Sequence, residues 1–265
     1  MRALVTGSAG FVGRHMTAEL LRRGWDVTAV DIAPGRYGWQ SELTAWLREG
    51  KSVYDLVVHA AAWTPHRQAI DSSPQMHLNN AVLDAELFSW AARTGQGRVL
   101  YFSSCAVLDE RPDAYGETKL MGERLAKYTR TLGVPVTVVR PFSGYGEDQS
   151  EDFPFRAFVE RAKRQEDPFV IWGSGRQVRD FIHIDDVVTE SLMAVECGTE
   201  DPVSLCTGIG TSMAELAALV CAEAGHRPKF KTVGGNQAAL RRVGVPAFRR
   251  PKISIAEGVR RAFRE

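Results

Sequence analysis

Three glycines at regular spacing follow the first apolar segment of the chain. Gly7, Gly10 and Gly13 come directly after a run that ends at Thr6, and an amphipathic stretch begins with them. A strand that enters a helix through such glycines makes a tight turn, which lets its backbone approach a ligand closely. The N–H groups at the start of the helix are then available to bind phosphate. This turn predicts a parallel α/β sheet that binds a dinucleotide.

The rest of the chain supports a doubly wound α/β fold. Short apolar runs alternate with longer amphipathic stretches, which is typical of a parallel sheet covered by helices on both faces. We expect strands over 3–6, 26–30, 56–59, 99–103, 136–140, 169–172 and 203–207. We expect helices over 13–23, 41–48, 78–93, 115–131, 153–164, 185–197 and 212–224.

A change of composition predicts the division into domains. After residue 140 the alternation gives way to a stretch rich in Gly, Pro and charged residues, so we place a boundary near Gly146. We therefore expect a dinucleotide-binding domain over 1–146 and a smaller, mainly substrate-binding α+β domain over 147–265. Some segments of the second region are expected to return to the first sheet.

An acidic residue favours one dinucleotide over the other. Asp31 ends the second expected strand, where a carboxylate can accept hydrogen bonds from both hydroxyls of an adenosine ribose. The same charge would repel a 2′-phosphate, so the sequence favours NAD over NADP. Arg36 leaves NADP open, although a solvated loop arginine is the simpler interpretation.

A tyrosine and a lysine four residues apart indicate redox chemistry. Tyr115 and Lys119 would share one face of a helix, so the ammonium can lie near the phenol. A positive charge favours the phenolate and should lower the tyrosine pKa from its usual value of about 10. Tyr115 is therefore the candidate base for the proton of a hydroxyl group whose carbon loses hydride.

Composition excludes several other classes of function. The formal charge is +1, from 33 basic and 32 acidic residues, which gives no general attraction for nucleic acid or an anionic membrane. The four cysteines form no C-x-x-C and no zinc-ligand spacing with histidine, so we expect reduced thiols and no metal. No apolar run is long enough for a signal sequence or a membrane span. A cytoplasmic protein is expected.

Several motifs, taken in order, resemble one known family. They are the glycine turn, His59-Ala60-Ala61-Ala62, Asn80, Ser103-Ser104, Tyr115-x-x-x-Lys119, Arg140-Pro141-Phe142-Ser143-Gly144-Tyr145-Gly146 and the stretch from Arg179 to Val187. Together they resemble the extended short-chain dehydrogenase/reductases, in particular the NAD-dependent epimerase/dehydratase branch that acts on nucleotide sugars. The resemblance implies a Rossmann-type fold, NAD as cofactor, a nucleotide-sugar substrate and a homodimer built by helices 78–93 and 115–131.

The resemblance also implies roles for individual residues. Ser104, Tyr115 and Lys119 would be catalytic, and Ser104 is preferred to Ser103 because it stands three residues before Val107. Substrate contacts would come from Ser104, Ser143 and Arg179. His59 is interpreted as a core histidine with satisfied hydrogen bonds. The cofactor would lie against Gly7, Gly10, Phe11, Val12, Gly13, Asp31, Ile32, Ala60, Ala61, Ala62, Asn80, Tyr115, Lys119 and Pro141.

The residues after Ser104 distinguish among the reactions of the family. Dehydratases of this family carry an Asp-Glu pair there, whereas this chain has Cys105 and Ala106, which disfavours dehydration. Epimerisation through a transient 4-keto sugar needs no further acid or base and is the first hypothesis. A 4-keto-sugar reductase that uses NAD(P)H is the alternative, and a non-catalytic NAD-binding sensor is the third.

The chain also departs from the family in three places. Tyr115 lies only 11 positions after Ser104, where relatives usually have a longer loop over the sugar. The stretch from Asp31 to Asp55 is short and shows no third strand with an acidic residue. Ser143 stands where sugar-binding relatives commonly have asparagine. These departures weaken any transfer of substrate specificity from the family.

Overall fold

The chain forms two compact units. The computed structural model describes residues 1–31, 39–63, 74–234, 240–248 and 252–264. The first unit comprises Met1–Arg140 and Val188–Val203, and the second comprises Pro141–Val187 and Ser204–Glu265. The chain therefore leaves the first unit at Pro141, a few residues before Gly146, and re-enters it at Val188. Ile32 and Arg36 lie outside the described residues.

A parallel sheet forms the centre of the first unit. Its strand order is β2-β1-β3-β4-β5-β9, and β1 pairs in parallel with both β2 and β3, so that Val5 lies between Ala29 and Val58. The strands are β1 (Arg2–Thr6), β2 (Asp26–Val30), β3 (Leu56–His59), β4 (Val99–Phe102), β5 (Val136–Pro141) and β9 (Val203–Leu205). The predicted doubly wound sheet is confirmed.

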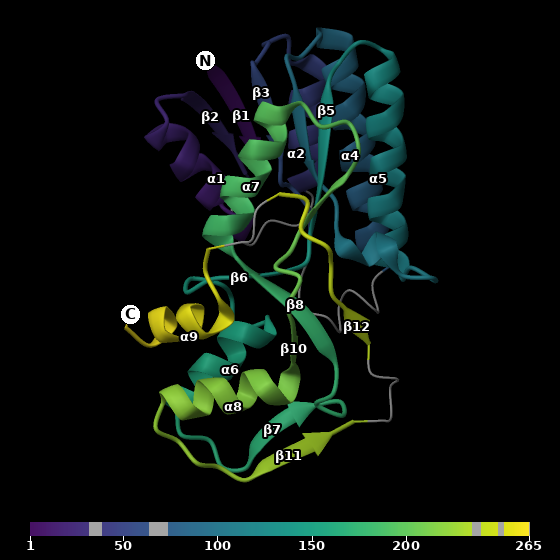
Figure 1. Ribbon diagram of the computed structural model, residues 1–265. Helices are drawn as coiled ribbons and strands as arrows, with labels where there is room; N and C mark the ends of the chain where they lie inside the picture. Colours follow the sequence, from purple (N-terminus) through teal and green to yellow (C-terminus); the bar gives the residue numbers. More distant parts are fainter. Residues whose placement is uncertain (32–38, 64–73, 235–239, 249–251, 265) are drawn as a thin grey trace. The chain divides into compact units, whose positions relative to one another are not determined.

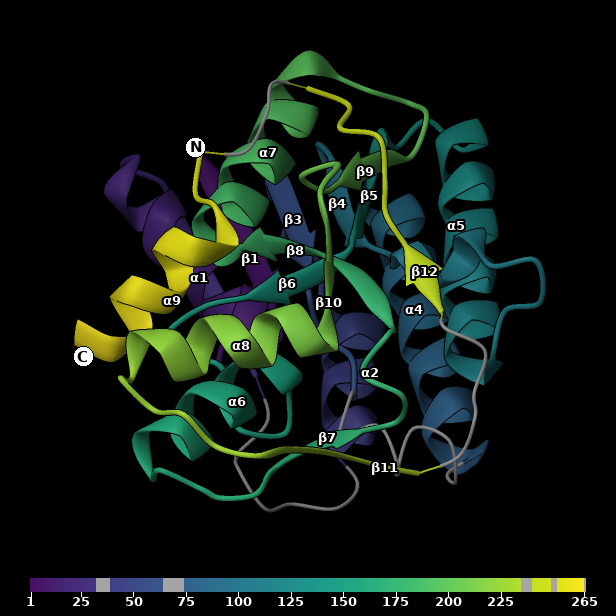
Figure 2. The ribbon, with the colours of Figure 1, turned by 60° about the horizontal axis from the view of Figure 1, so that its bottom comes forward.

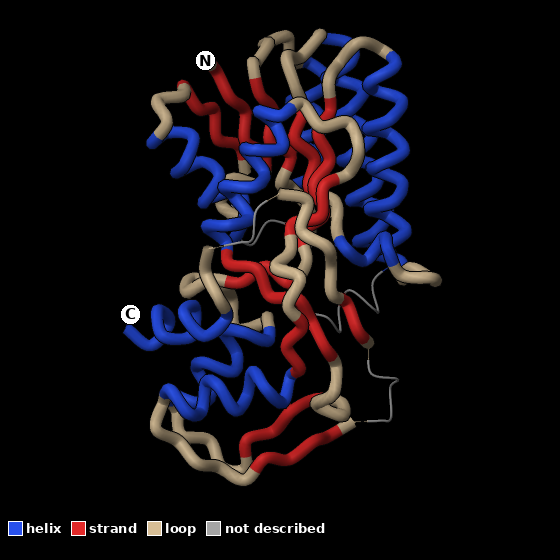
Figure 3. The backbone as a smooth tube through the Cα atoms, in the orientation of Figure 1, coloured by secondary structure: helices blue, strands red, loops and turns tan. Residues whose placement is uncertain are grey.

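Helices cover both faces of this sheet, as Figures 1 and 3 show. On one face lie α1 (Phe11–Arg22) and α7 (Ile184–Cys197), and on the other lie α2 (Trp39–Glu49), α4 (Pro74–Thr94) and α5 (Ala114–Thr131). Arg23, at the end of α1, forms an ion pair of 2.7 Å with Glu196 of α7. Buried Leu83, Leu87 and Tyr101 belong to the core between α4 and the sheet. Burial of such side chains supplies most of the stabilisation of a helix packed on a sheet.

The sheet ends at β2. Between β2 and β3, α2 is the only helix or strand within the described residues, so no further strand of that segment extends the sheet. The stretch from Asp31 to Asp55 is short, and α2 is the element described within it.

Within the described residues, the second unit combines helices with short strands (Figure 2). Its helices α6 (Pro154–Lys163), α8 (Met213–Glu223) and α9 (Ile255–Arg264) pack against one another around a core that includes Tyr145, Phe155 and Leu216. The strands are β6 (Ser143–Tyr145), β7 (Phe169–Trp172), β8 (Val178–His183), β10 (Gly210–Ser212), β11 (Phe230–Val233) and β12 (Arg241–Arg242). An α+β unit was expected, and β7, α6 and α8 were predicted, but β6, β8, β10, β11, β12 and α9 were not.

A buried carboxylate organises the strand that carries Arg179. Asp180 is fully buried on β8, and its oxygens accept hydrogen bonds from Thr207 N (2.7 Å), Thr207 Oγ1 (2.6 Å) and Gly208 N (2.8 Å). Such bonds compensate the carboxylate for the loss of water. They hold β8 against the loop that leads to β10.

Within the described residues, the structure has no helix that is both long and apolar enough to cross a membrane. The longest described helix, α4, has 21 residues, and it includes the charged residues Asp84, Glu86 and Arg93.

Candidate active site

The three glycines form a turn that has no room for larger side chains. Gly7 has a φ of +73°, and its carbonyl accepts a hydrogen bond of 3.0 Å from Gly10 N. A Cβ on Gly13 would lie 1.9 Å from the carbonyl oxygen of Gly7, far inside van der Waals contact. The first turn of α1 therefore lies directly on the strand end, which produces the close approach that the sequence predicted.

The turn presents backbone donors and lies beside the end of β3. Gly10 is the N-cap of α1 and supplies no side-chain hydrogen bond, so Phe11 and Val12 begin the helix without a side-chain cap. A Cβ on Gly7 would lie 2.6 Å from Ala61 N and 2.7 Å from the Ala60 carbonyl oxygen. A phosphate at this helix start would meet N–H groups between two closely packed backbone segments.

Asp31 is brought to the same turn. Its Oδ2 accepts a hydrogen bond from the backbone N–H of Ala9, between Gly7 and Gly10. This places a carboxylate at the end of β2 beside the glycines, as a ribose-binding role requires. The glycine cradle, the uncapped helix start and this carboxylate together fit an NAD molecule.

Asn80 supports the segment that follows β3. Its side chain is buried on α4, where Oδ1 accepts from Trp63 N at 2.9 Å and Nδ2 donates to Trp63 O at 3.0 Å. The carboxamide thus pairs with the backbone of the residue directly after Ala62. These two hydrogen bonds hold the backbone of Trp63 against α4.

Tyr115 and Lys119 lie one turn apart at the start of α5. Asp113 caps this helix by accepting a hydrogen bond of 2.9 Å from Gly116 N, which fixes the turn that carries Tyr115. Ser104 precedes the short 3₁₀ helix η1 (Cys105–Leu108), and its hydroxyl hydrogen-bonds the Tyr115 phenol. The structure therefore brings Ser104 and Tyr115 together.

The neighbouring serine is engaged elsewhere. Ser103 Oγ donates a hydrogen bond of 2.6 Å to Glu123 Oε1, and Arg140 binds both oxygens of Glu123, with Nε at 2.8 Å and Nη2 at 2.6 Å. The Ser103 hydroxyl is therefore engaged by a carboxylate that is itself held by Arg140. The preference for Ser104 as the partner of the tyrosine agrees with this geometry.

The pKa of Tyr115 moves in the direction opposite to the one expected. Burial raises the pKa of Tyr115 to about 12, and the hydrogen bond from Ser104 lowers it only in part. Lys119 was expected to lower this pKa, but its Nζ donates instead to the carbonyl oxygen of Phe102 at 2.9 Å. In the protein without a cofactor, the Tyr115 phenol is therefore protonated at neutral pH.

His59 is a core residue with both ring nitrogens bonded. Nδ1 lies 2.8 Å from Thr6 Oγ1, and Nε2 lies 3.0 Å from Asp84 Oδ1. The side chain is almost fully buried. The interpretation of His59 as a satisfied core histidine is confirmed.

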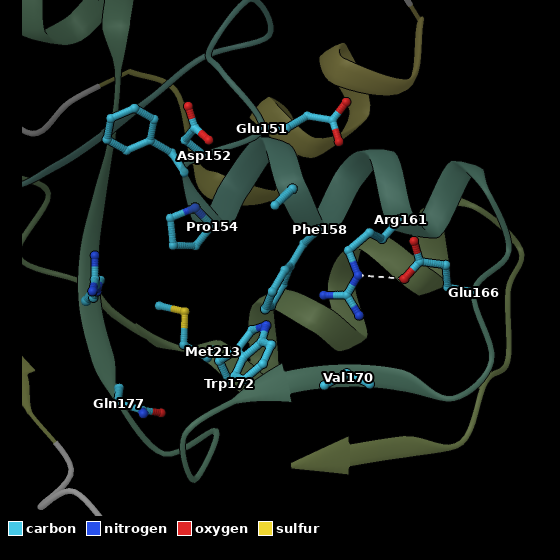
Figure 4. Close-up of a pocket in the computed structure, with 13 residues that line it drawn as sticks. Glu151, Asp152, Pro154, Phe158, Arg161, Glu166, Val170, Trp172, Gln177 and Met213 are labelled. Carbon is cyan, nitrogen blue, oxygen red and sulfur yellow. Dashed lines mark hydrogen bonds and ion pairs between the residues drawn. The ribbon is translucent and has the colours of Figure 1, made fainter. Parts of the chain in front are cut away.

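A pocket of about 570 Å³ lies within the second unit. Figure 4 shows Phe158, Trp172 and Met213 gathered in it, with Glu151 and Asp152 toward one side and the Arg161–Glu166 ion pair toward another. Trp172 is 74% exposed, and Arg179 from β8 also lines the pocket. Flat aromatic surface beside a guanidinium can bind a base and a phosphate group.

The remaining predicted residues lie on strands. Pro141 ends β5, the fifth strand in the order of the large sheet. Ser143 begins β6 and pairs with Phe181 of β8, two positions after Arg179. Among the described residues, no group of three or more His, Cys, Asp or Glu side chains could hold a metal ion.

Some residues around this site were not predicted from the sequence. Asp84, Tyr101 and Glu123 make buried polar contacts near Ser104, Tyr115 and Lys119, and Trp172 and Gln177 line the pocket of the second unit. A signal existed for Asp84 and Glu123. Each lies four positions after a predicted site residue on the same helix, Asn80 or Lys119, and therefore on the same helix face.

Comparison with known proteins places these features in a family. A family model described as "NAD dependent epimerase/dehydratase family" matches residues 3–204. The chain is 28% identical to a UDP-N-acetyl-alpha-D-glucosaminuronate decarboxylase of Bacillus cytotoxicus, over 74% of this chain and 71% of that protein. It is 29% identical to a dTDP-4-dehydro-6-deoxy-D-allose reductase of Streptomyces bikiniensis, over 92% and 86%.

Similarity extends over almost the whole chain. A UDP-glucose 4-epimerase of Mycolicibacterium smegmatis is 24% identical over 98% of this chain and 96% of its own length. The solved structure of a Thermus thermophilus UDP-glucose 4-epimerase in complex with NAD is 22% identical, with a TM-score of 0.84 over 100% of this chain and 99% of that one. With the fold, the glycine turn and the Ser104–Tyr115–Lys119 group, the family match shows that the chain belongs to the NAD dependent epimerase/dehydratase family.

Proposed function

We propose that this protein is an NAD-dependent epimerase that acts on a nucleotide-diphosphate sugar through a transient 4-keto intermediate. The observation that carries this proposal is the hydrogen bond between Ser104 and Tyr115, with Lys119 one turn further along α5. It joins a hydroxyl and a phenol that could both contact one substrate oxygen. A group of this kind can move a proton while the carbon loses or regains hydride.

Each residue has a distinct part in this reaction. Tyr115 takes the proton from the sugar hydroxyl and later returns it, and Ser104 donates a hydrogen bond to the same oxygen. NAD⁺, when bound, would supply the hydride acceptor and a positive charge. That positive charge opposes the burial that raises the pKa of Tyr115 to about 12, and so favours the phenolate.

The residues after Ser104 argue against dehydration. Cys105 and Ala106 are both buried in η1, where the family's dehydratases have an acidic pair. A buried thiol and a methyl group offer no second acid and base for removal of water. Epimerisation and reduction remain, because both need only the three residues described.

Reduction of a 4-keto sugar is the second candidate. Its support is the short connection through η1 and the similarity to the Streptomyces bikiniensis reductase. A reductase would consume one reduced cofactor per product, whereas an epimerase returns the hydride to the same sugar. A non-catalytic NAD-binding sensor is the third candidate, and it gives no reason for the Ser104–Tyr115 contact.

The pocket of the second unit supports a nucleotide-diphosphate substrate. Trp172 and Phe158 offer aromatic surface for a base, and Arg179 offers several fixed donors for a diphosphate. We assign Arg179 to substrate binding on this basis. Ser143 is assigned to substrate binding on the family resemblance, and it pairs with Phe181, two positions after Arg179 on β8. The four cysteines are free thiols, which supports a reducing, cytoplasmic location.

Turnover of nucleotide sugars tests the proposal. We expect purified protein with NAD to interconvert the C4 epimers of a UDP-, dTDP- or GDP-sugar without net change in NADH, as followed by NMR and absorbance. Stoichiometric consumption of NADH with a 4-keto sugar would favour the reductase instead. The Tyr115→Phe variant should lose about 100-fold or more of the activity while it still binds NAD. Binding of NAD without turnover of any sugar would contradict both enzyme proposals.

We also propose that the protein is a homodimer. The outer faces of α4 and α5 carry exposed apolar side chains, with Leu78 and Val82 on α4 and Met121 and Tyr128 on α5. Each pair has helical spacing, and the two helices pack side by side in the first unit (Figure 1). Exposed apolar side chains on two neighbouring helices favour association with a second copy.

A further inference from the structure

The buried carboxylate of Asp84 lies near Lys119. Asp84, on α4, is 2% exposed. Its Oδ2 accepts a hydrogen bond of 2.6 Å from the Tyr101 hydroxyl, and Lys119 Nζ lies 5.0 Å from the centroid of the Tyr101 ring. Tyr101 therefore contacts the carboxylate through its hydroxyl and the ammonium through its ring face. One aromatic side chain connects the two opposite charges.

A glycine on α5 lets the helix close on this carboxylate. Gly122 lies three positions after Lys119, and a Cβ there would lie 1.9 Å from Tyr101 Oη and 2.8 Å from Asp84 Oδ2. Any larger residue would push α5 away from α4. The helix that carries Tyr115 and Lys119 is therefore fitted closely to Asp84 and Tyr101.

The other contacts of Asp84 leave its charge in place. A neutral His59 can donate from Nε2–H to Asp84 Oδ1 at 3.0 Å while its Nδ1 accepts from the Thr6 hydroxyl at 2.8 Å. Both ring nitrogens are satisfied in this tautomer without a positive charge on the imidazole. The negative charge of Asp84 then balances the positive charge of Lys119. Through His59, these hydrogen bonds connect Asp84 to Thr6, the residue directly before the glycine turn.

We propose that Asp84 is a positioning residue that keeps Lys119 protonated and in place beside the cofactor, acting across the ring of Tyr101. This inference rests on the proposed function, in which Lys119 would hold the ribose of the nicotinamide. The charged ammonium has three N–H donors for the ribose hydroxyls and adds positive charge near the phenol of Tyr115. A neutral amine has fewer donors and no charge.

The electrostatics of the pair support this inference. Burial lowers the pKa of the Lys119 ammonium below its usual value, and the charge of Asp84 opposes that effect. Burial in turn raises the pKa of Asp84, but Lys119 and the hydrogen bonds from His59 and Tyr101 outweigh it and bring the pKa below its usual value. Asp84 is the titratable group whose charge raises the pKa of Lys119. Other titratable groups on the elements around Lys119 include His59 on β3, Tyr101 on β4, Cys105 in η1, His77 and Glu86 on α4, and Tyr115, Glu117 and Glu123 on α5.

Titration of Lys119 in the cofactor-free protein tests the inference. In Asp84→Asn, which keeps the shape of the side chain but not its charge, we expect the proton affinity of Lys119 to fall about tenfold or more. The midpoint can be followed by NMR of ¹³C-labelled lysine, with Lys119→Met to assign the signal. An unchanged midpoint in Asp84→Asn would overturn the proposal.

Two matched variants separate charge from structure. Tyr101→Phe removes the hydrogen bond to Asp84 but leaves the carboxylate and the ring, so the Lys119 midpoint should move much less than in Asp84→Asn. Glu123→Gln removes a carboxylate on α5 that is bonded to Ser103 and Arg140, and the midpoint should stay at the wild-type value. A drop in Glu123→Gln equal to that in Asp84→Asn would contradict a specific role for Asp84.

A reciprocal measurement covers the case in which Asp84→Asn does not fold. Coupling between two sites acts equally in both directions, so Lys119→Met should raise the proton affinity of Asp84 by the same factor. The carboxyl ¹³C signal of Asp84 reports this shift, and no shift would overturn the proposal. Neither titration uses a sugar or NAD, so failure of the proposed epimerase activity and failure of this inference give different results.

Discussion

At the scale of single residues, the Ser104 hydroxyl determines how far Tyr115 can be activated by the protein alone. Ser104 Oγ accepts a hydrogen bond of 3.2 Å from Ala106 N, which orients the hydroxyl for donation to the phenol. The hydrogen bond from Ser104 lowers the pKa of Tyr115, which burial raises. The serine thus counteracts part of the penalty for placing a tyrosine in a buried site.

Replacing this serine should change the pH dependence of the reaction. Ser104→Ala removes a hydrogen bond that favours the phenolate, so the pKa of Tyr115 rises further above its usual value. The base is active when deprotonated, and therefore the rising limb of log(kcat/KM) against pH should move to higher pH. Ser103→Ala is the matched control, since Ser103 is bonded to Glu123, and its limb should stay in place. Equal movement in both variants would argue against a direct bond from Ser104.

At the scale of elements, the glycine turn depends on contacts between backbone atoms. The Cβ of an alanine at position 13 would meet the Gly7 carbonyl oxygen at 1.9 Å, and no change of rotamer can relieve this contact. At Gly10 the corresponding distance is 3.1 Å, which a small shift can relieve. Position 10 should therefore tolerate an alanine better than position 13 does.

Alanine substitutions should show this difference. We expect Gly13→Ala to cost about 1–3 kcal/mol of unfolding free energy and to abolish tight binding of NAD, because α1 must move away from β1. Gly10→Ala should cost less and retain more binding. Urea unfolding and calorimetric titration with NAD measure the two effects. Equal losses in both variants would contradict the close approach at Gly13.

The elements also show what the sequence could and could not predict. Alternating apolar runs predicted the strands and helices of the first unit, because each element there has its own local period. Strand β8 was missed because its Asp180 looks unsuited to burial until Thr207 and Gly208 supply its hydrogen bonds. Helix α9 was overlooked although its buried positions, at Val259 and Ala262, have helical spacing.

The candidate site was predictable to a similar extent. Tyr115 and Lys119 are visible in the sequence, because one helix turn fixes their relation. The group around Asp84 was not, since its partners come from three strands and a second helix. Only the tertiary fold places Thr6, His59, Tyr101 and Lys119 around one carboxylate.

At the scale of the whole molecule, the two units carry different parts of the proposed activity. The first holds the glycine turn and the Ser104–Tyr115–Lys119 group, and the second holds the aromatic pocket with Arg179. The first also carries the apolar outer faces of α4 and α5. Association through these faces would belong to the catalytic unit.

A single charge on α4 should break the proposed dimer. We expect wild-type protein to sediment as a dimer and Val82→Lys as a monomer, because a lysine at the centre of an apolar interface loses its hydration. Leu21→Lys, at an exposed leucine on α1, is the matched control and should remain dimeric. Analytical ultracentrifugation measures the masses. A monomeric wild type, or loss of the dimer in both variants, would contradict an interface at α4 and α5.

The exposed indole of Trp172 gives the second unit an optical signal of its own. Trp172 is 74% exposed, whereas Trp63 is 37% exposed and Trp90 is buried in the core of the first unit, so solvent quenchers such as iodide should act most strongly on Trp172. A base stacked on Trp172 would shield it from such quenchers and change its emission. Occupation of the pocket could therefore be followed by fluorescence in real time, without any sugar being converted.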